Sequence, residues 1–167
     1  MAQSRGKDFE HIIRDAFESV PGVSIDRIPD QTMGFKGACN ISDFIVYKEP
    51  YEYYIECKTV HGNTLPFSNI STNQWQGMLE KSKIPGVFAG VICWWVDRDV
   101  TRYIPIQLLN AEKRIGSKSI RYDYGFAYFN ESTCKVLPPI DIQGKKKRVF
   151  FDYDMEVFFN EITNANN

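Results

Sequence analysis

Apolar side chains recur at helical spacing near the start of the chain. Between residues 8 and 20 they occupy positions 9, 12, 13, 16, 17 and 20, and Pro21-Gly22 follows directly. A single apolar stripe of this kind predicts an amphipathic helix that ends before the proline. Residues 23–28 then fit a short strand, and residues 30–38, which contain two glycines, fit a loop.

Two short runs rich in aromatic and β-branched residues come next. They cover residues 41–47 and 51–57, and Glu49-Pro50 separates them. Such runs on either side of a proline-containing turn predict an antiparallel β-hairpin.

The register of this hairpin follows from its turn. If the loop is Glu49-Pro50, Lys48 faces Tyr51, and counting back along both strands sets Asp43 opposite Glu56; a symmetric four-residue loop preserves the same register. Directly opposed residues hold their Cβ atoms roughly 4.5 to 5.5 Å apart on one face of the sheet. Like charges at that separation destabilise a sheet unless a cation lies between them. The hairpin therefore predicts a metal site.

The two residues after Glu56 add to this hypothesis. Lys58 projects from the same face as Glu56, because side chains on a strand alternate, and it places an amine beside the carboxylates. Cys57 points to the opposite face, although its backbone carbonyl is available as a ligand. Hard oxygen ligands without a histidine suit Mg²⁺ or Mn²⁺ rather than zinc. The simpler alternative is that Asp43 only begins a strand and that Glu56 and Lys58 form an exposed pair.

Further along the chain the pattern alternates between helices and strands. It predicts a helix over residues 73–83, a strand buried on both faces over 87–96, a returning strand over 101–104, a helix over 106–115 that Pro105 opens, a strand over 149–153 and a final helix over 154–163. This order predicts an α/β fold with a mixed central sheet flanked by helices.

Composition and charge restrict the function classes. A chain of 167 residues with 43% hydrophobic content fits one domain, residues 1–167, with one core. The net charge of −1 gives no overall attraction to a polyanion, so a nucleic-acid surface would have to be local. The four cysteines occur singly, without CxxC spacing, which argues against a zinc site or a disulfide framework. Because no signal core is present and the longest apolar run, 87–96, is too short to span a bilayer, we expect a soluble, cytoplasmic protein.

The hairpin resembles the signature of a known enzyme family. Ser42-Asp43, a spacer of twelve residues and Glu56-Cys57-Lys58 resemble the motif of the PD-(D/E)xK nucleases, with Ser in place of Pro. Beyond the motif, the chain is similar in the same order to RecU-type Holliday junction resolvases at residues 63–70 with Gln74, at 86–88 and at 117–121. The resemblance departs at residues 23–40, an interval too short to hold the full stalk of the RecU proteins.

The resemblance implies a restriction-endonuclease-like core and a set of functional residues. The catalytic residues would be Asp43, Glu56, Lys58, Glu10 on the first helix and Gln74 at the start of a later helix. Asp43, Glu56 and the Cys57 carbonyl would hold Mg²⁺, with Mn²⁺ as a substitute. Contacts to DNA are expected from Arg5 and Lys7 in the arm before the first helix, Lys36 in the following loop, Lys118, Arg121, and the run Lys145, Lys146, Lys147 and Arg148. An exposed loop without a partner is the alternative for this last run.

The resemblance implies a Mg²⁺-dependent endonuclease that resolves four-way (Holliday) junctions by paired nicks in DNA recombination and repair. Symmetric resolution needs two active sites, so this hypothesis includes a homodimer. One alternative is another PD-(D/E)xK endonuclease, a restriction, repair or nicking enzyme that acts on duplex DNA. A second is a catalytically silent DNA-binding module of the same fold.

Overall fold

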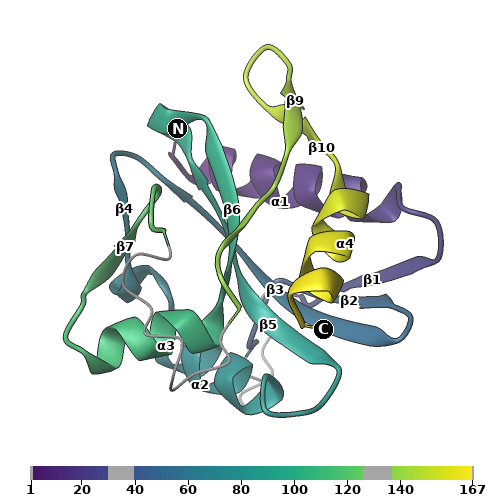
Figure 1. Cartoon of the computed structure of the whole chain (residues 1–167). Helices are drawn as coiled ribbons and strands as arrows, with labels where there is room; N and C mark the ends of the chain where they lie inside the picture. Colours follow the sequence, from purple (N-terminus) through teal and green to yellow (C-terminus); the bar gives the residue numbers. More distant parts are fainter. Residues whose placement is uncertain (1, 30–39, 126–136, 167) are drawn as a thin grey trace.

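A six-stranded mixed sheet forms the centre of the protein (Figure 1). The computed structural model describes residues 2–29, 40–125 and 137–166. The strand order is β1-β2-β3-β5-β6-β8, where the strands are β1 Val23–Arg27, β2 Phe44–Lys48, β3 Tyr51–Val60, β5 Val87–Trp95, β6 Val100–Pro105 and β8 Ile140–Asp141. β3 and β5 are parallel, and the other neighbouring pairs are antiparallel.

Helices cover both faces of this sheet, which confirms the predicted fold class (Figure 1). The helices are α1 Ala2–Glu18, α2 Thr72–Lys81, α3 Ile106–Arg114 and α4 Met155–Asn166. α1 and α4 pack on one face and α2 and α3 on the other, each with its own buried apolar cluster. Among the residues described, no helix is long and apolar enough to cross a membrane.

β3 divides its side chains between these two clusters. Tyr53, Ile55 and Cys57 belong to the cluster under α1 and α4, whereas Tyr54 and Val60 belong to the cluster under α2 and α3. Glu56 and Lys58 share the alternation of Tyr54 and Val60, so they face the α2 side.

The hairpin register predicted from the sequence is confirmed. Lys48 pairs with Tyr51 across the Glu49-Pro50 turn, and the ladder continues to Phe44 opposite Ile55. The ladder ends at that pair. Asp43 precedes β2, and its N–H donates to the carbonyl of Ile55 at 3.0 Å, so the direct pairing of Asp43 with Glu56 that the sequence predicted is not part of the ladder. Within the ladder, the count from the turn was sufficient because a turn of fixed length leaves a single register.

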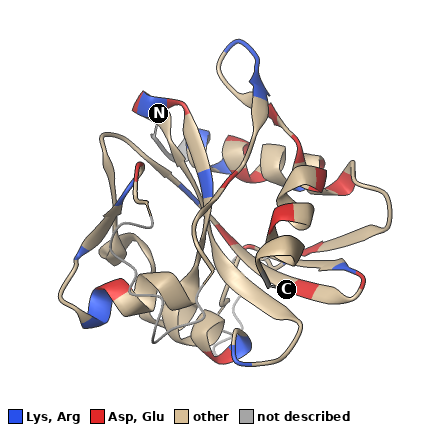
Figure 2. Ribbon diagram, in the orientation of Figure 1, with Lys and Arg blue, Asp and Glu red and all other residues tan. Residues whose placement is uncertain are grey.

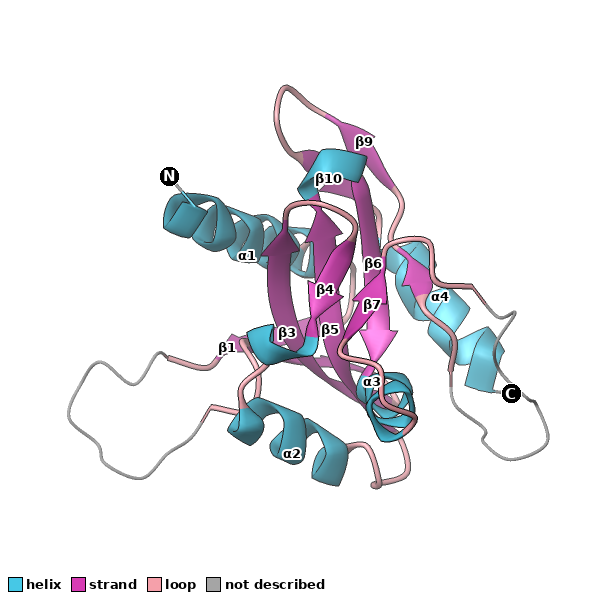
Figure 3. Ribbon diagram, turned by 90° about the vertical axis from the view of Figure 1, so that its left-hand side faces the viewer, coloured by secondary structure: helices cyan, strands magenta, loops and turns pink. Residues whose placement is uncertain are grey.

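Two short ribbons lie outside the central sheet. β4 Thr64–Pro66 pairs with β7 Ser119–Arg121, and β9 Gly144–Lys146 pairs with β10 Phe151–Tyr153. Figure 3 shows β4 and β7 in front of β5 and β6, on the α2 and α3 side. The sequence pattern predicts neither β4, β7 nor β9, because three-residue strands are too short to show an alternation.

The first helix begins earlier than the sequence predicted. α1 starts at Ala2 rather than at residue 8, so Arg5 and Lys7 belong to the helix and the expected arm before it is wrong. The residues before Phe9 carry no apolar stripe, but Gln, Arg and Lys are good helix formers and extend the helix without one.

Close packing of β5 on β6 gives a test of the fold. A Cβ added at Gly90 would lie 2.4 Å from the carbonyl oxygen of Ile104 and 2.7 Å from the Tyr103 ring. Because a backbone atom cannot move aside cheaply, we expect Gly90→Ala to lower the free energy of unfolding by about 2–3 kcal/mol in urea denaturation. Gly6→Ala is the control, since its Cβ would approach Thr59 Oγ1 only to 4.0 Å, and it should be neutral or stabilising. Equal stability of Gly90→Ala and the parent would contradict this packing.

Candidate active site

The carboxylate of Glu56 is buried on the α2 side of β3. The residue is 1% exposed, so the alternative that Glu56 belongs to an exposed pair is wrong. Glu56 Oε1 accepts hydrogen bonds from Lys58 Nζ at 2.6 Å and from Gln74 Nε2 at 2.7 Å. Glu56 Oε2 is also buried and has no hydrogen-bond partner among the described residues. Burial raises the pKa of Glu56, and the contacts with Lys58 and Gln74 oppose that shift.

Asp43 is held beside Glu56 by the backbone around it. Its Oδ2 accepts a hydrogen bond from the N–H of Cys57 at 2.7 Å. The N–H of Asp43 donates to the carbonyl of Ile55 at 3.0 Å, and its own carbonyl accepts from Ile28 at 2.9 Å. Burial, followed by the charge of Glu56, raises the pKa of Asp43 to about 7. The structure therefore brings two interacting carboxyl groups close together.

This pair fits a hard divalent cation. Two buried carboxylates repel each other unless a positive charge is supplied, and Glu56 Oε2 is an acceptor without a donor. The Cys57 side chain points into the opposite core, as predicted, and burial raises the pKa of its thiol. In residues 2–29, 40–125 and 137–166, no group of three or more His, Cys, Asp or Glu side chains lies close enough together to hold a metal ion. Two side-chain oxygens would thus be supplemented by backbone, water or substrate oxygens.

Gln74 is fixed in place by the start of α2. Ser71 caps this helix, and Gln74 Oε1 accepts the N–H of Ser71 at 3.0 Å while the Gln74 N–H donates to Ser71 Oγ at 3.3 Å. This reciprocal capping box leaves Gln74 Nε2 to donate to Glu56. The predicted position of Gln74, in the first helical turn and facing Glu56, is confirmed.

Glu10 lies at the margin of this group. Its Oε2 is 3.2 Å from Arg27 Nη2, and its side chain is 23% exposed. The charge of Glu10 contributes to the raised pKa values of both Asp43 and Glu56, which indicates that it lies near them. The structure thus brings together Asp43, Glu56, Lys58 and Gln74, with Glu10 beside them.

The predicted DNA contacts outside the run at 145–148 differ in their surroundings. Lys36 lies outside the described residues. Lys7 and Lys118 are exposed, and Arg5 lies 3.4 Å from His61 Nε2. Arg121 is exposed but donates two hydrogen bonds to Asp123, at 2.8 and 3.0 Å, which offset its charge.

The basic run at residues 145–148 lies on the projecting hairpin of β9 and β10, whose loop is rich in Lys and Arg in Figure 2. Lys146 pairs with Asp99, and Lys147 pairs with Asp152 at 3.2 Å. Lys145 and Arg148 are exposed and form no ion pair within the part of the chain that the structure describes.

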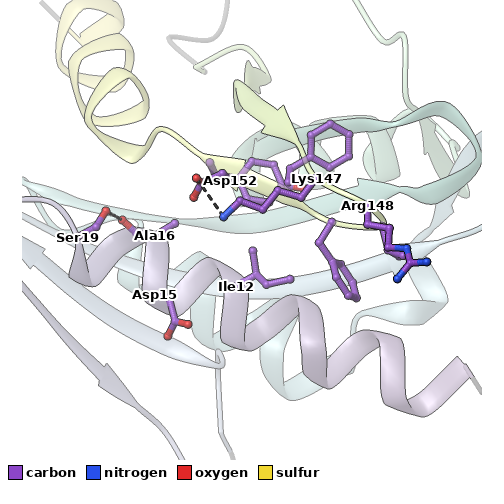
Figure 4. A pocket seen from close by; sticks show the side chains of 11 residues that line it. Ile12, Asp15, Ala16, Ser19, Lys147, Arg148 and Asp152 are labelled. Carbon is purple, nitrogen blue, oxygen red and sulfur yellow. Dashed lines mark hydrogen bonds and ion pairs between the residues drawn. The ribbon is translucent and has the colours of Figure 1, made fainter.

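This hairpin stands beside α1. Between them lies a cavity of about 530 Å³, lined by residues that include Ile12, Ala16, Phe150, Lys147 and Arg148 (Figure 4). The pairing of Lys146 with Asp99 also places this hairpin beside the turn between β5 and β6.

One polar cluster near Lys58 was missed by the sequence analysis. His61 Nδ1 lies 2.9 Å from Asp97 Oδ1, and the N–H of Gly62 donates to Asp97 Oδ2 at 2.7 Å. The parallel register of β3 and β5 pairs Val60 with Trp95, so the residues that follow these two strands meet. A prediction that β3 and β5 are parallel neighbours would have brought these residues together.

Comparison with known proteins gives a likeness in structure but none in sequence. No protein family model matches the chain, and no curated protein matches it by sequence. Among solved structures, the chain is similar to Hjc, a Holliday junction resolvase from the archaeal hyperthermophile Archaeoglobus fulgidus. The TM-score is 0.45 and the identity 18%, over 61% of this chain and 78% of that chain. The functional proposal for this chain therefore depends on its own residues.

The raised pKa of Asp43 predicts a pH dependence of stability. Because that pKa is about 7 in the folded protein and near 3.8 ordinarily, the folded protein holds the proton more tightly than the unfolded chain does. Without divalent ions, the free energy of unfolding should fall as the pH rises from about 4 to 7. Asp43→Asn should remove most of that fall and be roughly 2–4 kcal/mol more stable than the parent at pH 8.

Urea denaturation in a chelator at several pH values measures this effect. Asp26→Asn, at an exposed position of β1, is the matched control and should behave like the parent. Parallel pH profiles for Asp43→Asn and the parent would show that the buried carboxyl pair is not coupled as described.

Proposed function

We propose that this chain is a Mg²⁺-dependent endodeoxyribonuclease with a restriction-endonuclease-like core. The observation that carries the proposal is the buried pair of Asp43 and Glu56, with Lys58 and Gln74 on one oxygen of Glu56 and the other oxygen without a partner among the described residues. Two acidic groups can hold a divalent ion that activates water for phosphodiester hydrolysis, and the amine beside them can orient that water.

The residues that would hold the ion are Asp43, Glu56 through Oε2, and Cys57 through its carbonyl. When bound, Mg²⁺ or Mn²⁺ would lower the pKa of a water molecule and neutralise the charge on the leaving oxygen. Gln74 and Lys58 both hold Oε1, which would leave the remaining oxygen of Glu56 available to an ion. The N–H of Cys57 does the same for Asp43 by engaging Oδ2.

Lys58 is the residue that would act on the attacking water. Its side chain is 22% exposed, so it can contact substrate while its amine remains 2.6 Å from Glu56 Oε1. It would orient the water and help to deprotonate it, with Glu10 and Gln74 completing the site. The product would carry a 5′-phosphate.

The crossover from β3 to β5 supports this assignment. Two parallel neighbouring strands need a connection over one face of the sheet, and here it includes α2. The start of α2 thereby delivers Gln74 to the same face as Glu56, so a side chain 18 positions away reaches the carboxylate.

We further propose that the substrate is a four-way DNA junction and that the chain acts in recombination or repair. Paired symmetric nicks need two active sites, and this chain supplies one, so the active form would be a homodimer. A duplex endonuclease of the same class is the second candidate, since the carboxylate pair serves either substrate.

A cleavage assay tests the nuclease proposal. With Mg²⁺ or Mn²⁺ the parent should nick branched DNA, and a chelator should abolish the reaction. Asp43→Ala and Glu56→Gln should each lower the rate by about a thousandfold or more, and Lys58→Ala by about a hundredfold, because each removes charge stabilisation at the reacting phosphate. Asp26→Asn is the control. Branched and duplex DNA left intact by the parent, or cleavage by Asp43→Ala at the parent rate, would contradict the proposal.

The substrate is tested by comparing a mobile four-way junction with a linear duplex of the same sequence. A resolvase should cut the junction at least about tenfold faster and place symmetric nicks in two strands, because both subunits engage it. Mixing the parent with Asp43→Ala should increase the fraction of singly nicked junctions. Equal rates on both substrates would instead support the duplex endonuclease, and DNA binding without metal-dependent turnover would support a binding module.

A further inference from the structure

Polar side chains from three elements meet just beyond the C-terminal end of β3. We call them the β3-end cluster: Arg5 on α1, His61 and Asn63 between β3 and β4, and Asp97 and Arg98 on η2 Val96–Arg98. The parallel pairing of Val60 with Trp95 brings the ends of β3 and β5 together, so the two following segments contact each other.

His61 is oriented by Asp97. Asp97 Oδ1 lies 2.9 Å from His61 Nδ1, and Asp97 Oδ2 accepts the Gly62 N–H at 2.7 Å, so both carboxylate oxygens are engaged. The other ring nitrogen, Nε2, is 3.4 Å from Arg5 Nη1. Since the His61 side chain is 62% exposed, its Nε2 edge and the Arg5 guanidinium face solvent side by side.

Arg98, at the end of η2, is held by Asn63. Its Nε donates to Asn63 Oδ1 at 2.7 Å, and its guanidinium lies 5.4 Å from the centre of the Tyr122 ring. Arg98 is exposed and forms no ion pair among the described residues. An exposed guanidinium held by neutral partners keeps its charge and its remaining N–H donors for a phosphate.

We propose that the β3-end cluster binds the DNA phosphate backbone a few nucleotides from the scissile position, through Arg98 and through Arg5, which His61 holds in place. This inference rests on the proposed nuclease function. Lys58 and His61 are three residues apart, which is about 10 Å along a strand. Phosphates of one DNA strand advance by about 3.4 Å along the helix axis, so a phosphate roughly three nucleotides from the scissile one would reach the cluster.

The cluster suits this role better than the basic run on the β9–β10 hairpin. Two residues of that run, Lys146 and Lys147, are paired with Asp99 and Asp152, which offset their charges. The β3-end cluster instead continues directly from the strand that carries Glu56 and Lys58. Its one acidic member, Asp97, has both oxygens turned to His61 and Gly62.

The test measures DNA affinity without cleavage. The full chain is titrated against a fluorescein-labelled junction and a labelled duplex, with Ca²⁺ in place of Mg²⁺, over a range of salt concentrations. Arg98→Gln should weaken binding roughly fivefold or more and reduce the slope of log K against log salt by about one, because one phosphate contact is lost. Arg98→Lys keeps the charge and should retain the slope. His61→Ala should weaken binding several-fold.

Lys83→Gln is the matched control, since it removes an exposed positive charge beyond the C-terminal end of α2 and should leave affinity and slope unchanged. Thermal unfolding midpoints confirm that each variant is folded. If the chain binds and cuts DNA but Arg98→Gln and His61→Ala bind with the parent's affinity and salt slope, this inference is wrong and the nuclease proposal stands. If the chain neither binds nor cuts DNA, both proposals fail.

Discussion

Two carboxyl groups that repel each other lie close together where the β2–β3 ladder ends. The pairing of Lys48 with Tyr51 fixes the register of that ladder, and the N–H of Cys57 then holds Asp43 next to Glu56. Burial raises the pKa values of both groups, and the charge of Glu56 adds to the rise for Asp43. Such a pair costs stability in the folded chain and gains a role once a divalent cation is shared between its oxygens, as we propose.

The rest of the candidate site depends on β3. Its parallel pairing with β5 requires a crossover, and the crossover brings α2 to the Glu56 face. The capping box of α2 then uses Gln74 twice, once to close the helix start and once to hold Glu56. The same pairing brings together the turns after β3 and β5. The proposed metal site therefore lies on β3, and the proposed phosphate contacts lie just beyond its end.

The sequence was informative wherever local geometry decides the outcome. The hairpin register and the position of Gln74 follow from turn length, side-chain alternation and helix capping, which act over a few residues. Contacts between distant segments left no such signal, as with the β4–β7 ribbon and the His61–Asp97 pair. Likewise, a count of basic residues cannot show that Asp99 and Asp152 neutralise half of the run at 145–148.

The central claim is that Asp43 and Glu56 share one divalent cation, and anomalous X-ray diffraction from crystals of the full chain grown with Mn²⁺ measures this directly. We predict an anomalous peak about 2.0 to 2.4 Å from an oxygen of each carboxylate, the range for oxygen ligands of such ions. The same crystals without Mn²⁺ should show no peak there. Full Mn²⁺ occupancy elsewhere in the molecule, with none between these two side chains, would contradict the account.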